Sequence, residues 1–222
     1  MNILVVDIGG THVKFRTQRQ AEPIKFKSGP KMTPEGMMAE LMSATKTWKF
    51  DRVTIGYPGP VVHNKIFHEP HNLAPGWINF DFGEAFRGKK VRIINDAALQ
   101  ALGSYRQGRM LYLGLGTGLG SAMVVEGIVQ PMELAHLPWK KGRTYEEHLG
   151  VSALESFGKR KWAKNVIEVT QKLQQTLASD YVVLGGGNAQ LIEPPPENVF
   201  IGTNDNAFKG GFMLWQRKYG AF

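Results

Sequence analysis

The sequence contains no cysteine, which excludes disulfides, thiol chemistry and any zinc or iron–sulfur site built from cysteine. It also lacks an apolar run close to the ~18–20 residues that a bilayer-spanning helix needs. The opening MNILVVDIGG has no basic segment ahead of its apolar stretch, as a secretory signal would have. We therefore expect a cytoplasmic protein with no membrane partner. Its 222 residues, 42% of them hydrophobic, suffice for one ample core or two small ones without a structural metal.

Acidic residues are few relative to basic ones, with 19 Asp and Glu against 27 Lys and Arg and a net charge of +8. The excess is uneven, because residues 1–31 and residues 140–164 each carry a net charge of +4. An uneven basic excess favours a polyanionic partner such as nucleic acid, an acidic membrane surface or a phosphate polymer. A solvated surface tuned for solubility explains the same excess about as well.

The hydrophobic pattern predicts a similar order of elements twice along the chain. The first half predicts strands and helices over residues 3–8, 12–17, 24–27, 34–48 (helix, one apolar face from Met37 to Trp48), 52–57, 81–86 (helix), 91–94 and 96–105 (helix). The second half predicts them over residues 110–115, 120–125, 128–131, 145–157 (helix), 160–178 (helix), 181–184, 199–201 and 207–215 (helix). This structural repetition predicts two α/β domains that face one another.

Two glycine-rich turns stand at matching places in the two halves. Asp7-Ile8-Gly9-Gly10-Thr11 joins the first two strands, and GLGTGLGS (residues 114–121) joins the corresponding pair in the second half. Glycines let backbone N–H groups approach an anion, Thr11 adds a hydroxyl, and Asp7 can hold Mg²⁺ directly or through water. Either turn alone is commonly just a tight turn, whereas the two together favour phosphate gripped between the domains.

Asn95 and Asp96 follow the predicted strand 91–94 at the start of a helix. Asp96 is either the N-cap of that helix or a carboxylate that accepts the proton of a substrate hydroxyl. The helix N-terminus is expected to lower the pKa of Asp96 and so to make it a weaker base. A weak base is acceptable in phosphoryl transfer, where positioning and charge stabilisation do most of the catalysis.

Two further motifs carry polar or flexible groups. Glu133 and His136 lie three residues apart after a predicted strand and could together bind a vicinal diol. His136 could instead bind a metal, but the spacing of Glu133 and His136 is poor evidence for a metal site. Gly185, Gly186 and Gly187 end another strand. They suit a nucleotide base or ribose, or simply a close turn.

In this order, the motifs DIGGT, PGP, IND, GLGTGLGSA, ELAH and LGGG resemble the ROK family of sugar kinases, over nearly the whole chain. The resemblance implies an α/β fold of two actin-like (ribonuclease-H-like) domains, each βββαβαβα, with a cleft between them. The expected domains are residues 1–95 and 96–205, with a terminal helix over residues 206–222 that packs back on the first. The implied activity is phosphoryl transfer to a hexose with Mg²⁺ as cofactor.

The resemblance also assigns roles to individual residues, with Asp96 as the catalytic base and Asp7 as the Mg²⁺ ligand, directly or through water. The implied phosphate-binding and cofactor-binding residues are Asp7, Gly9, Gly10, Thr11, Gly116, Thr117, Gly118, Gly120, Ser121, Gly185, Gly186 and Gly187. The implied sugar-binding residues are Gly59, Asn72, Asn95, Asp96, Glu133, His136 and Glu146.

At several positions the sequence departs from the pattern that is usual in the family. Residues 140–144 stand where many members carry a cysteine-rich zinc motif, so no zinc is expected. Ala135 replaces the usual glycine, which puts that turn and the choice of sugar in question. Only six residues precede Asp7, so the helix-turn-helix of the family's repressors is not expected. The short length, the missing zinc motif and the second glycine turn are most similar to the family's polyphosphate glucokinases, and a phosphate polymer needs a longer basic track than ATP.

These patterns predict a kinase that phosphorylates the 6-hydroxyl of glucose or a similar hexose from polyphosphate, ATP or both. An ATP-only kinase for another sugar is the first alternative. A non-catalytic sugar or polyanion sensor is the second, and the retained Asp96 argues against it. Nucleic acid is not expected as a partner, because the aromatic residues in the basic segments have spacings that suit a core. The preferred hexose, the preferred donor and homodimer formation stay open.

Overall fold

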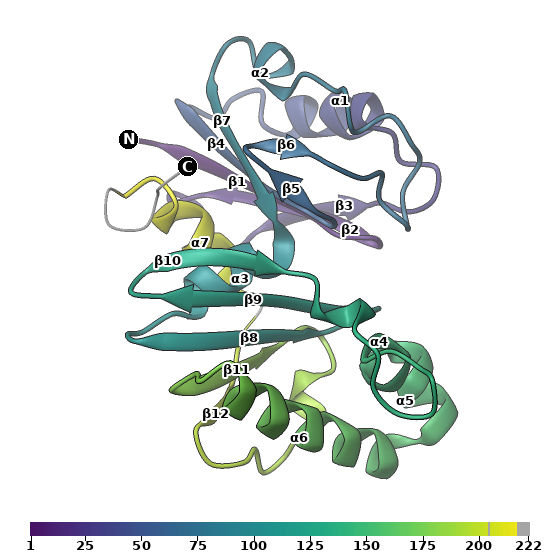
Figure 1. The fold of residues 1–222 in the computed structure, drawn as a ribbon. Coiled ribbons are helices and arrows are strands. Elements are labelled where there is room, and N and C mark those ends of the chain that lie inside the picture. Colours follow the sequence, from purple (N-terminus) through teal and green to yellow (C-terminus); the bar gives the residue numbers. More distant parts are fainter. Residues whose placement is uncertain (204, 217–222) are drawn as a thin grey trace.

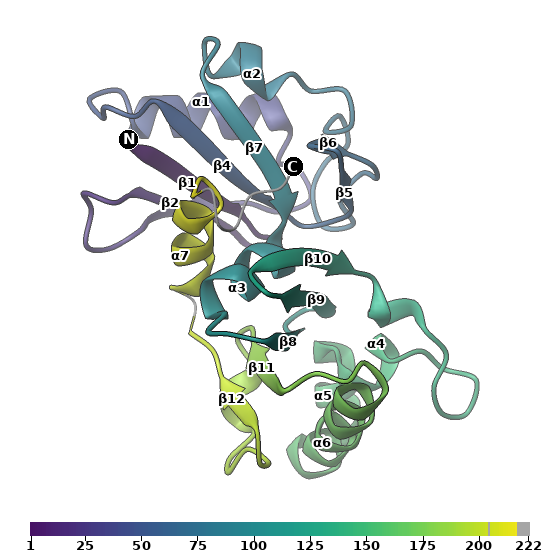
Figure 2. The same cartoon turned by 60° about the vertical axis from the view of Figure 1, so that its left-hand side comes forward.

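The computed structural model describes residues 1–203 and 205–216. In this part of the chain, two lobes are each built on a five-stranded sheet (Figure 1). Helices α3 (Asp96–Ser104) and α7 (Asn206–Met213) lie between the two sheets (Figure 2). Among the described residues, no helix combines the length and apolar character needed to cross a membrane.

The first half begins with three strands and continues with helices and strands in alternation. Its other elements are β1 (Ile3–Ile8), β2 (His12–Thr17), β3 (Ile24–Lys27), α1 (Pro34–Ala44), β4 (Arg52–Tyr57), β5 (Val61–Val62), β6 (Lys65–Ile66), α2 (Phe82–Ala85) and β7 (Lys90–Asn95). Helix α1 begins where the sequence predicts, because the Thr33 hydroxyl accepts the Gly36 N–H (3.1 Å) and Pro34 is tolerated in the first turn.

The second half repeats this order. Its elements are β8 (Arg109–Leu115), β9 (Leu119–Val125), β10 (Ile128–Met132), the 3₁₀ turn η1 (Leu134–His136), α4 (Glu146–Leu149), α5 (Val151–Phe157), α6 (Lys159–Thr176), β11 (Tyr181–Gly185), the 3₁₀ turn η2 (Ala189–Leu191) and β12 (Val199–Ile201). Where the first half has α2 before its last strand, the second has only η2.

The two sheets have the same topology. The strand orders are β3-β2-β1-β4-β7 and β10-β9-β8-β11-β12, and in each sheet three antiparallel strands are followed by two parallel ones. The prediction of two similar α/β halves is confirmed. The domain boundaries at residues 95 and 205 stay a prediction, because α3 and α7 contribute to a core shared by both sheets.

Alternation along the strands divides the apolar side chains among three cores. Even-numbered residues of β1 pack with α1, and the odd-numbered Ile3 and Val5 pack with α3 and α7. The far face of the second sheet packs against α4, α5 and α6 around the fully buried Trp162. Packing on the faces of the sheets explains the alternation in the sequence of β2 and the continuous apolar runs of β4 and β8.

Helices α3 and α7 cross at glycines. A methyl group on Gly103 would lie 1.9 Å from the Asn206 carbonyl oxygen, and one on Gly210 would lie 1.9 Å from that of Leu99. The backbones therefore touch directly at this crossing, which only glycine permits. After α7, the Trp215 indole donates to the Thr54 hydroxyl (2.9 Å) and so attaches the end of the described chain to the first sheet. The remainder of the predicted terminal helix, residues 217–222, lies outside the described residues.

Three sequence expectations differ from the structure. The predicted helix over residues 145–157 is two helices, α4 and α5, separated at Gly150. Trp48 follows α1 instead of extending its apolar face, although its ring still packs on Phe15 with centroids 5.8 Å apart. The short hairpin of β5 and β6 was not predicted, because two-residue strands give no periodic signal.

Candidate active site

The first predicted phosphate loop is the tight turn between β1 and β2. The Gly9 N–H donates to the His12 carbonyl (3.0 Å). Ser28, directly after β3, donates its hydroxyl to the Gly9 carbonyl (2.5 Å) and its N–H to the Thr11 carbonyl (3.0 Å). Within the described residues, the N–H groups of Gly10 and Thr11 donate no hydrogen bond. The turn is therefore braced through its carbonyls and keeps two donors for an anion.

The same turn adjoins the loop that carries a predicted sugar ligand. A methyl group on Gly10 would lie 3.0 Å from Cβ of Asn72, which is exposed. The phosphate loop and this side of the predicted sugar site are therefore in direct contact.

The junction of β7 and α3 positions the predicted catalytic pair. Asn95, not Asp96, is the N-cap: its Oδ1 accepts the Ala98 N–H (3.0 Å). The Asn95 amide also donates to the Gly59 carbonyl (3.2 Å), which joins two predicted sugar ligands. Asp96 is the first residue of the helix, and its Oδ1 accepts the Ala97 N–H (2.8 Å). Because Asn95 performs the capping, the Asp96 carboxylate is not needed as the cap.

The Asp7 carboxylate and the backbone of Asp96 approach one another across Gly56 in β4. A methyl group on Gly56 would lie 3.4 Å from Oδ1 of Asp7 and 3.7 Å from Cα of Asp96. Glycine in a strand often marks such a close approach. Gly56 is therefore a sequence signal for this approach, although it stands outside the motifs that predict the site.

Burial and like charges determine the titration of this pair. Burial raises the pKa of Asp96 to about 7, and the charges of Asp7 and Glu133 act in the same direction, while the Ala97 N–H opposes them. Burial also raises the pKa of Asp7 to about 6, against the attraction of Lys14. The expectation that the helix N-terminus lowers the pKa of Asp96 is therefore wrong, because burial outweighs the helix end.

The second glycine turn is shorter than the sequence suggests. Gly114 and Gly120 lie inside β8 and β9, so that the turn itself is Gly116, Thr117 and Gly118. A methyl group on Gly120 would lie 2.8 Å from Cβ of Ala97, the residue after Asp96. The second sheet thus contacts the first turn of α3 beside the candidate base.

Glu146 supports this second turn. Its Oε2 accepts the Leu119 N–H (3.0 Å), and a methyl group on Gly118 would lie 2.2 Å from the same oxygen. Its carbonyl accepts the Gly150 N–H (2.8 Å) at the break between α4 and α5. The predicted sugar ligand Glu146 is therefore bonded to the predicted phosphate loop.

Ser121 has a different place from the one predicted. It lies in β9 with 1% of its surface exposed, and its hydroxyl donates to the Met132 carbonyl (2.7 Å) and accepts the Leu134 N–H (3.1 Å). Both partners flank Glu133. We therefore assign Ser121 to holding the Glu133 turn instead of binding phosphate.

Glu133 and His136 lie at the two ends of that turn, both exposed. Partial desolvation raises the pKa of Glu133, His136 and His68 oppose the shift, and Glu146 adds to it. These charged groups therefore lie near one another, and the charge of Glu133 also raises the pKa of Asp96. Ala135, which replaces the usual glycine, is buried at 3% exposure in the core of the second lobe, where its methyl group packs.

The third glycine motif lies at the end of β11. A methyl group on Gly185 would lie 2.1 Å from the Tyr112 hydroxyl, and Gly186 has a φ of 79°. Both glycines are therefore required by packing and backbone geometry, whereas Gly187 is exposed with open space around it. No hydrogen bond within the described residues links these three glycines to Asp7, Asp96 or Glu133.

The structure thus brings Asp7, Asp96, Glu133, His136 and Glu146 into one electrostatic group, with residues from both lobes. Sequence reasoning missed His68, Ser28 and Tyr112. The Tyr112 hydroxyl donates to Gln100 (2.6 Å), and its pKa is raised by burial and by the charges of Asp96 and Asp7. An isolated His, Ser or Tyr outside a motif gives no sequence signal of this kind.

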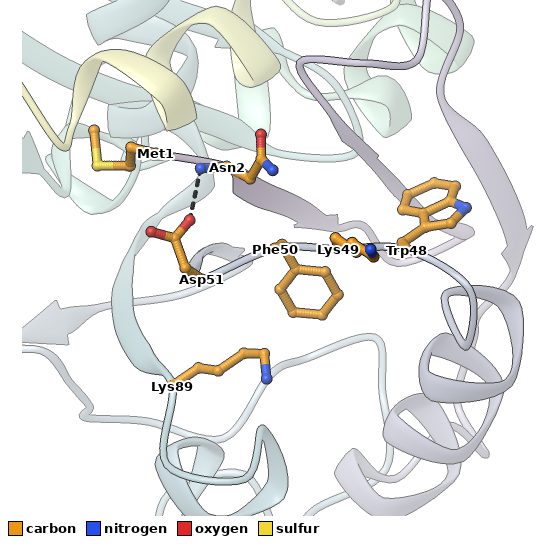
Figure 3. A pocket seen from close by; sticks show the side chains of 7 residues that line it. All are labelled: Met1, Asn2, Trp48, Lys49, Phe50, Asp51 and Lys89. Atoms are coloured by element: carbon orange, nitrogen blue, oxygen red, sulfur yellow. Dashed lines mark hydrogen bonds between the residues drawn. The ribbon is translucent and has the colours of Figure 1, made fainter.

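Two surface hollows among the described residues lie away from Asp7, Asp96 and Glu133. One, of about 450 Å³, is lined by residues at the start of β1 and β4, where the Asn2 N–H donates to Asp51 (2.6 Å; Figure 3). Asp7 and Gly9 lie at the opposite end of β1. Within the described residues, no three His, Asp or Glu side chains form a group that could hold a metal.

Comparisons with the sequences of known proteins agree on one family. A sequence model of the ROK family matches residues 3–131. Over 205 aligned residues, the chain is 28% identical to the polyphosphate glucokinase of Mycobacterium tuberculosis; the match covers 82% of this chain and 76% of that protein.

Solved structures agree in fold. An inorganic polyphosphate/ATP-glucomannokinase from Arthrobacter sp. strain KM has a TM-score of 0.79 at 22% identity, covering 95% of this chain and 96% of the other. A ROK family protein from Streptococcus pneumoniae in complex with sucrose has a TM-score of 0.79 at 17% identity, covering 98% and 99%. At these identities the likeness shows the fold alone, which confirms the predicted actin-like architecture.

Proposed function

Because this chain belongs to the ROK family and is a sugar kinase, a phosphotransferase with an alcohol as acceptor, we propose that it phosphorylates the 6-hydroxyl of glucose or a similar hexose. The proposed donor is polyphosphate, with ATP as a second donor. The observation that carries the proposal is the position of Asp96, which is freed from capping and lies beside both Asp7 and Glu133. The polyphosphate glucokinases among its relatives support the choice of sugar and donor.

Asp96 is the general base in this mechanism. A carboxyl with a pKa of about 7 is ionised in a large fraction of molecules at neutral pH, and it is more basic than an ordinary Asp. It orients the sugar hydroxyl and accepts its proton as the oxygen attacks the terminal phosphorus of the donor. The N–H of Ala97 holds one carboxylate oxygen in place (2.8 Å), so the other can face the substrate.

Asp7 fits a magnesium ligand of the kind that needs substrate phosphates to complete its shell. Within the described residues its carboxylate accepts no hydrogen bond, and burial beside Asp96 disfavours its charged form. Mg²⁺ is commonly bound through one or two carboxylates together with phosphate oxygens and water. When bound, it would neutralise donor charge; the N–H groups of Gly10 and Thr11 and the turn at Gly116–Gly118 would hold the donor phosphates.

The sugar is held from both lobes. We assign hydroxyl contacts to Asn72 and Asn95 from the first lobe and to Glu133 and His136 from the second, with Gly59 forming a wall through its bond to Asn95. One carboxylate oxygen of Glu146 accepts the Leu119 N–H, which leaves the other oxygen for a sugar hydroxyl. Because the contacts come from both lobes, closure of the lobes on the sugar would exclude water from the reaction.

The decisive experiment measures glucose 6-phosphate in a coupled assay, with ATP and polyphosphate supplied side by side. We expect turnover with both donors and a lower KM for long polyphosphate. Turnover with ATP alone would replace this proposal by an ATP-dependent sugar kinase. No turnover with either donor across a panel of hexoses would favour a sugar or polyanion sensor on the kinase scaffold.

A further inference from the structure

The face of the first sheet that carries Asp7 also carries a set of basic residues. In the register of β1, β2 and β3, Asp7 lies opposite Lys14, and Lys14 lies opposite Lys25. The next pair along the same strands is His12 opposite Lys27. Residues directly opposite one another, and residues two apart in a strand, point to the same side of a sheet. These four basic residues therefore form one ladder on the side of the sheet where Asp7 lies.

The burial pattern supports this placement. The alternate residues Val13 and Phe15 are fully buried, and Phe26 packs on Phe15 with centroids 5.7 Å apart. Their side of the sheet is the core, so the ladder is on the other side. Lys25 and Lys27 are exposed, and His12 and Lys14 are partly exposed. Neighbouring strands are separated by about 4.8 Å, so the row from Asp7 through Lys14 to Lys25 spans roughly 10 Å.

The ladder adjoins the first phosphate loop at two points. His12 directly follows Thr11, and its Nδ1 lies 3.3 Å from the Thr11 hydroxyl. Lys27 directly precedes Ser28, which bonds the carbonyls of Gly9 and Thr11. A phosphate chain whose end lies in the loop would meet the pair His12 and Lys27 first and the pair Lys14 and Lys25 next.

Without a bound ligand, the ladder destabilises the folded protein. Like charges directly opposite one another on a sheet repel, and no ion pair among the described residues involves Lys14, Lys25 or Lys27. Farther along the same face, Arg16 is paired with Asp205 (2.6 Å) and packs over Phe208. Lys14 is attracted by Asp7, which lies opposite it, whereas Lys25 and Lys27 have only Lys14 and His12 opposite them. An anionic ligand on this part of the face would relieve the remaining repulsion.

We propose that His12, Lys14, Lys25 and Lys27 form the binding track for the part of a polyphosphate chain that extends beyond the reacting phosphates. This inference rests on the proposed use of polyphosphate, but it concerns binding and is tested without turnover. The side chains of the track are basic, and the aromatic Phe26 points to the other face of the sheet. The track therefore lacks the stacking surfaces that single-stranded nucleic acid requires.

The second basic segment is less suited to the same task. Lys140 is paired with Glu168 (2.6 Å) and lies over the Trp139 ring, and Lys161 lies over Phe157. The charges of Lys140 and Lys161 therefore already interact with groups of the protein itself. The triple variant Lys140→Ser, Lys141→Ser, Arg143→Ser therefore serves as the competing test of where the chain runs.

The experiment measures binding of end-labelled long polyphosphate to the whole protein by fluorescence anisotropy, without sugar, over a range of salt concentrations. For Lys25→Ser/Lys27→Ser we expect about tenfold weaker binding at low salt. By analogy with single-stranded nucleic acid, the slope of log K against log salt should fall in magnitude by about 0.7 per charge removed, or about 1.4 in total. The matched control Lys46→Ser/Lys49→Ser removes the same charge from the opposite end of the sheet and should bind as wild type does.

Four outcomes would overturn the track. Unchanged binding by the Lys25/Lys27 variant, or loss of binding in the Lys140/Lys141/Arg143 variant alone, would place the chain elsewhere. No binding by the wild type would refute the site, and equal affinity for a single-stranded oligonucleotide of equal charge would indicate a nucleic-acid surface instead. Binding through Lys25 and Lys27 without phosphoryl transfer from polyphosphate would retain the track and refute only the proposed donor.

Discussion

Replacing Asp96 by Asn tests the candidate base through activity and stability together. Asn keeps the shape of the side chain and an oxygen that can accept the Ala97 N–H, so the local structure should persist. Loss of a positioned general base commonly lowers turnover by ~10²–10⁴. We expect a kcat reduction in that range, with the KM for sugar changed by no more than a few-fold, because the hydroxyl contacts remain.

The stability effect has a definite sign. The pKa of Asp96 in the folded protein is raised from 3.8 to about 7, so folding favours the neutral carboxyl. The favourable contribution is complete below pH 4 and is lost as the pH rises through about 7. Asn is neutral at every pH and escapes this loss. The variant should therefore be more stable than the wild type at pH 8, with the difference shrinking toward pH 5.

The magnitude follows from the same shift. At 1.36 kcal/mol per pH unit, the difference between 3.8 and about 7 gives a ceiling of about 4 kcal/mol. Part of Asp96 stays exposed to solvent, which reduces the effect, and we expect about 1–3 kcal/mol at pH 8. For a protein of this size, that corresponds to a rise in Tm of about 3–10 °C.

The assay combines steady-state kinetics with thermal unfolding at pH 5 and pH 8, without Mg²⁺ in the unfolding measurements. Asp81→Asn is the matched control: Asp81 is an exposed N-cap whose Oδ1 accepts the Glu84 N–H (2.9 Å), and Asn caps equally well. The control should match the wild type in both measurements. If Asp96→Asn keeps more than half of the wild-type kcat, or is destabilised at pH 8 relative to pH 5, the assignment of Asp96 is wrong.

Three further results are expected. Glu133→Gln and His136→Ala should raise the KM for sugar about tenfold or more, because Gln is a weaker acceptor than the carboxylate and Ala offers a sugar hydroxyl no partner; an effect on kcat alone would argue against sugar contact. Gly118→Ala should raise the KM for both substrates, because its methyl group meets the Glu146 carboxylate, whereas Gly116→Ala meets no protein atom and should leave the KM for sugar unchanged; equal effects on the KM for sugar would contradict this geometry. A zinc-selective chelator followed by excess Mg²⁺ should leave activity intact, and a stoichiometric zinc in elemental analysis would overturn the expected absence of zinc.

Much of the fold was predictable because local pattern and tertiary packing agree. The alternation in β2 reflects one buried and one polar face, and the apolar run of β4 reflects a strand buried on both sides. The position of Asn95 and Asp96 between a strand and a helix was correct for the same reason. Only the division of roles between them was not visible, because an N-cap is decided by one hydrogen bond.

The unpredicted features depend on residues far apart in the sequence. The raised pKa of Asp96 results from burial by other elements and from charges at Asp7 and Glu133. The helix break at Gly150 lies beside Thr117 of the second turn, whose carbonyl accepts the Val151 N–H (3.2 Å). Strand alternation indicates which residues share a face, but the pairing of Lys14 with Lys25 requires the register of the hairpin. Single-sequence patterns carry none of this information.

The position of the candidate base depends on both halves of the duplicated fold. Asp96 begins α3, which is packed between the sheets; Gly56 of the first sheet approaches it on one side, and Gly120 of the second contacts the adjacent Ala97. A methyl group on Gly56 would lie 2.7 Å from the Leu99 side chain and one on Gly120 would lie 2.8 Å from Cβ of Ala97, so larger residues at either glycine would disturb the helix that carries the base. The turn after β10 of the second sheet also supplies Glu133, whose charge raises the pKa of Asp96. The proton affinity of the base therefore depends on groups of both lobes, because Asp7 lies in the first and Glu133 in the second.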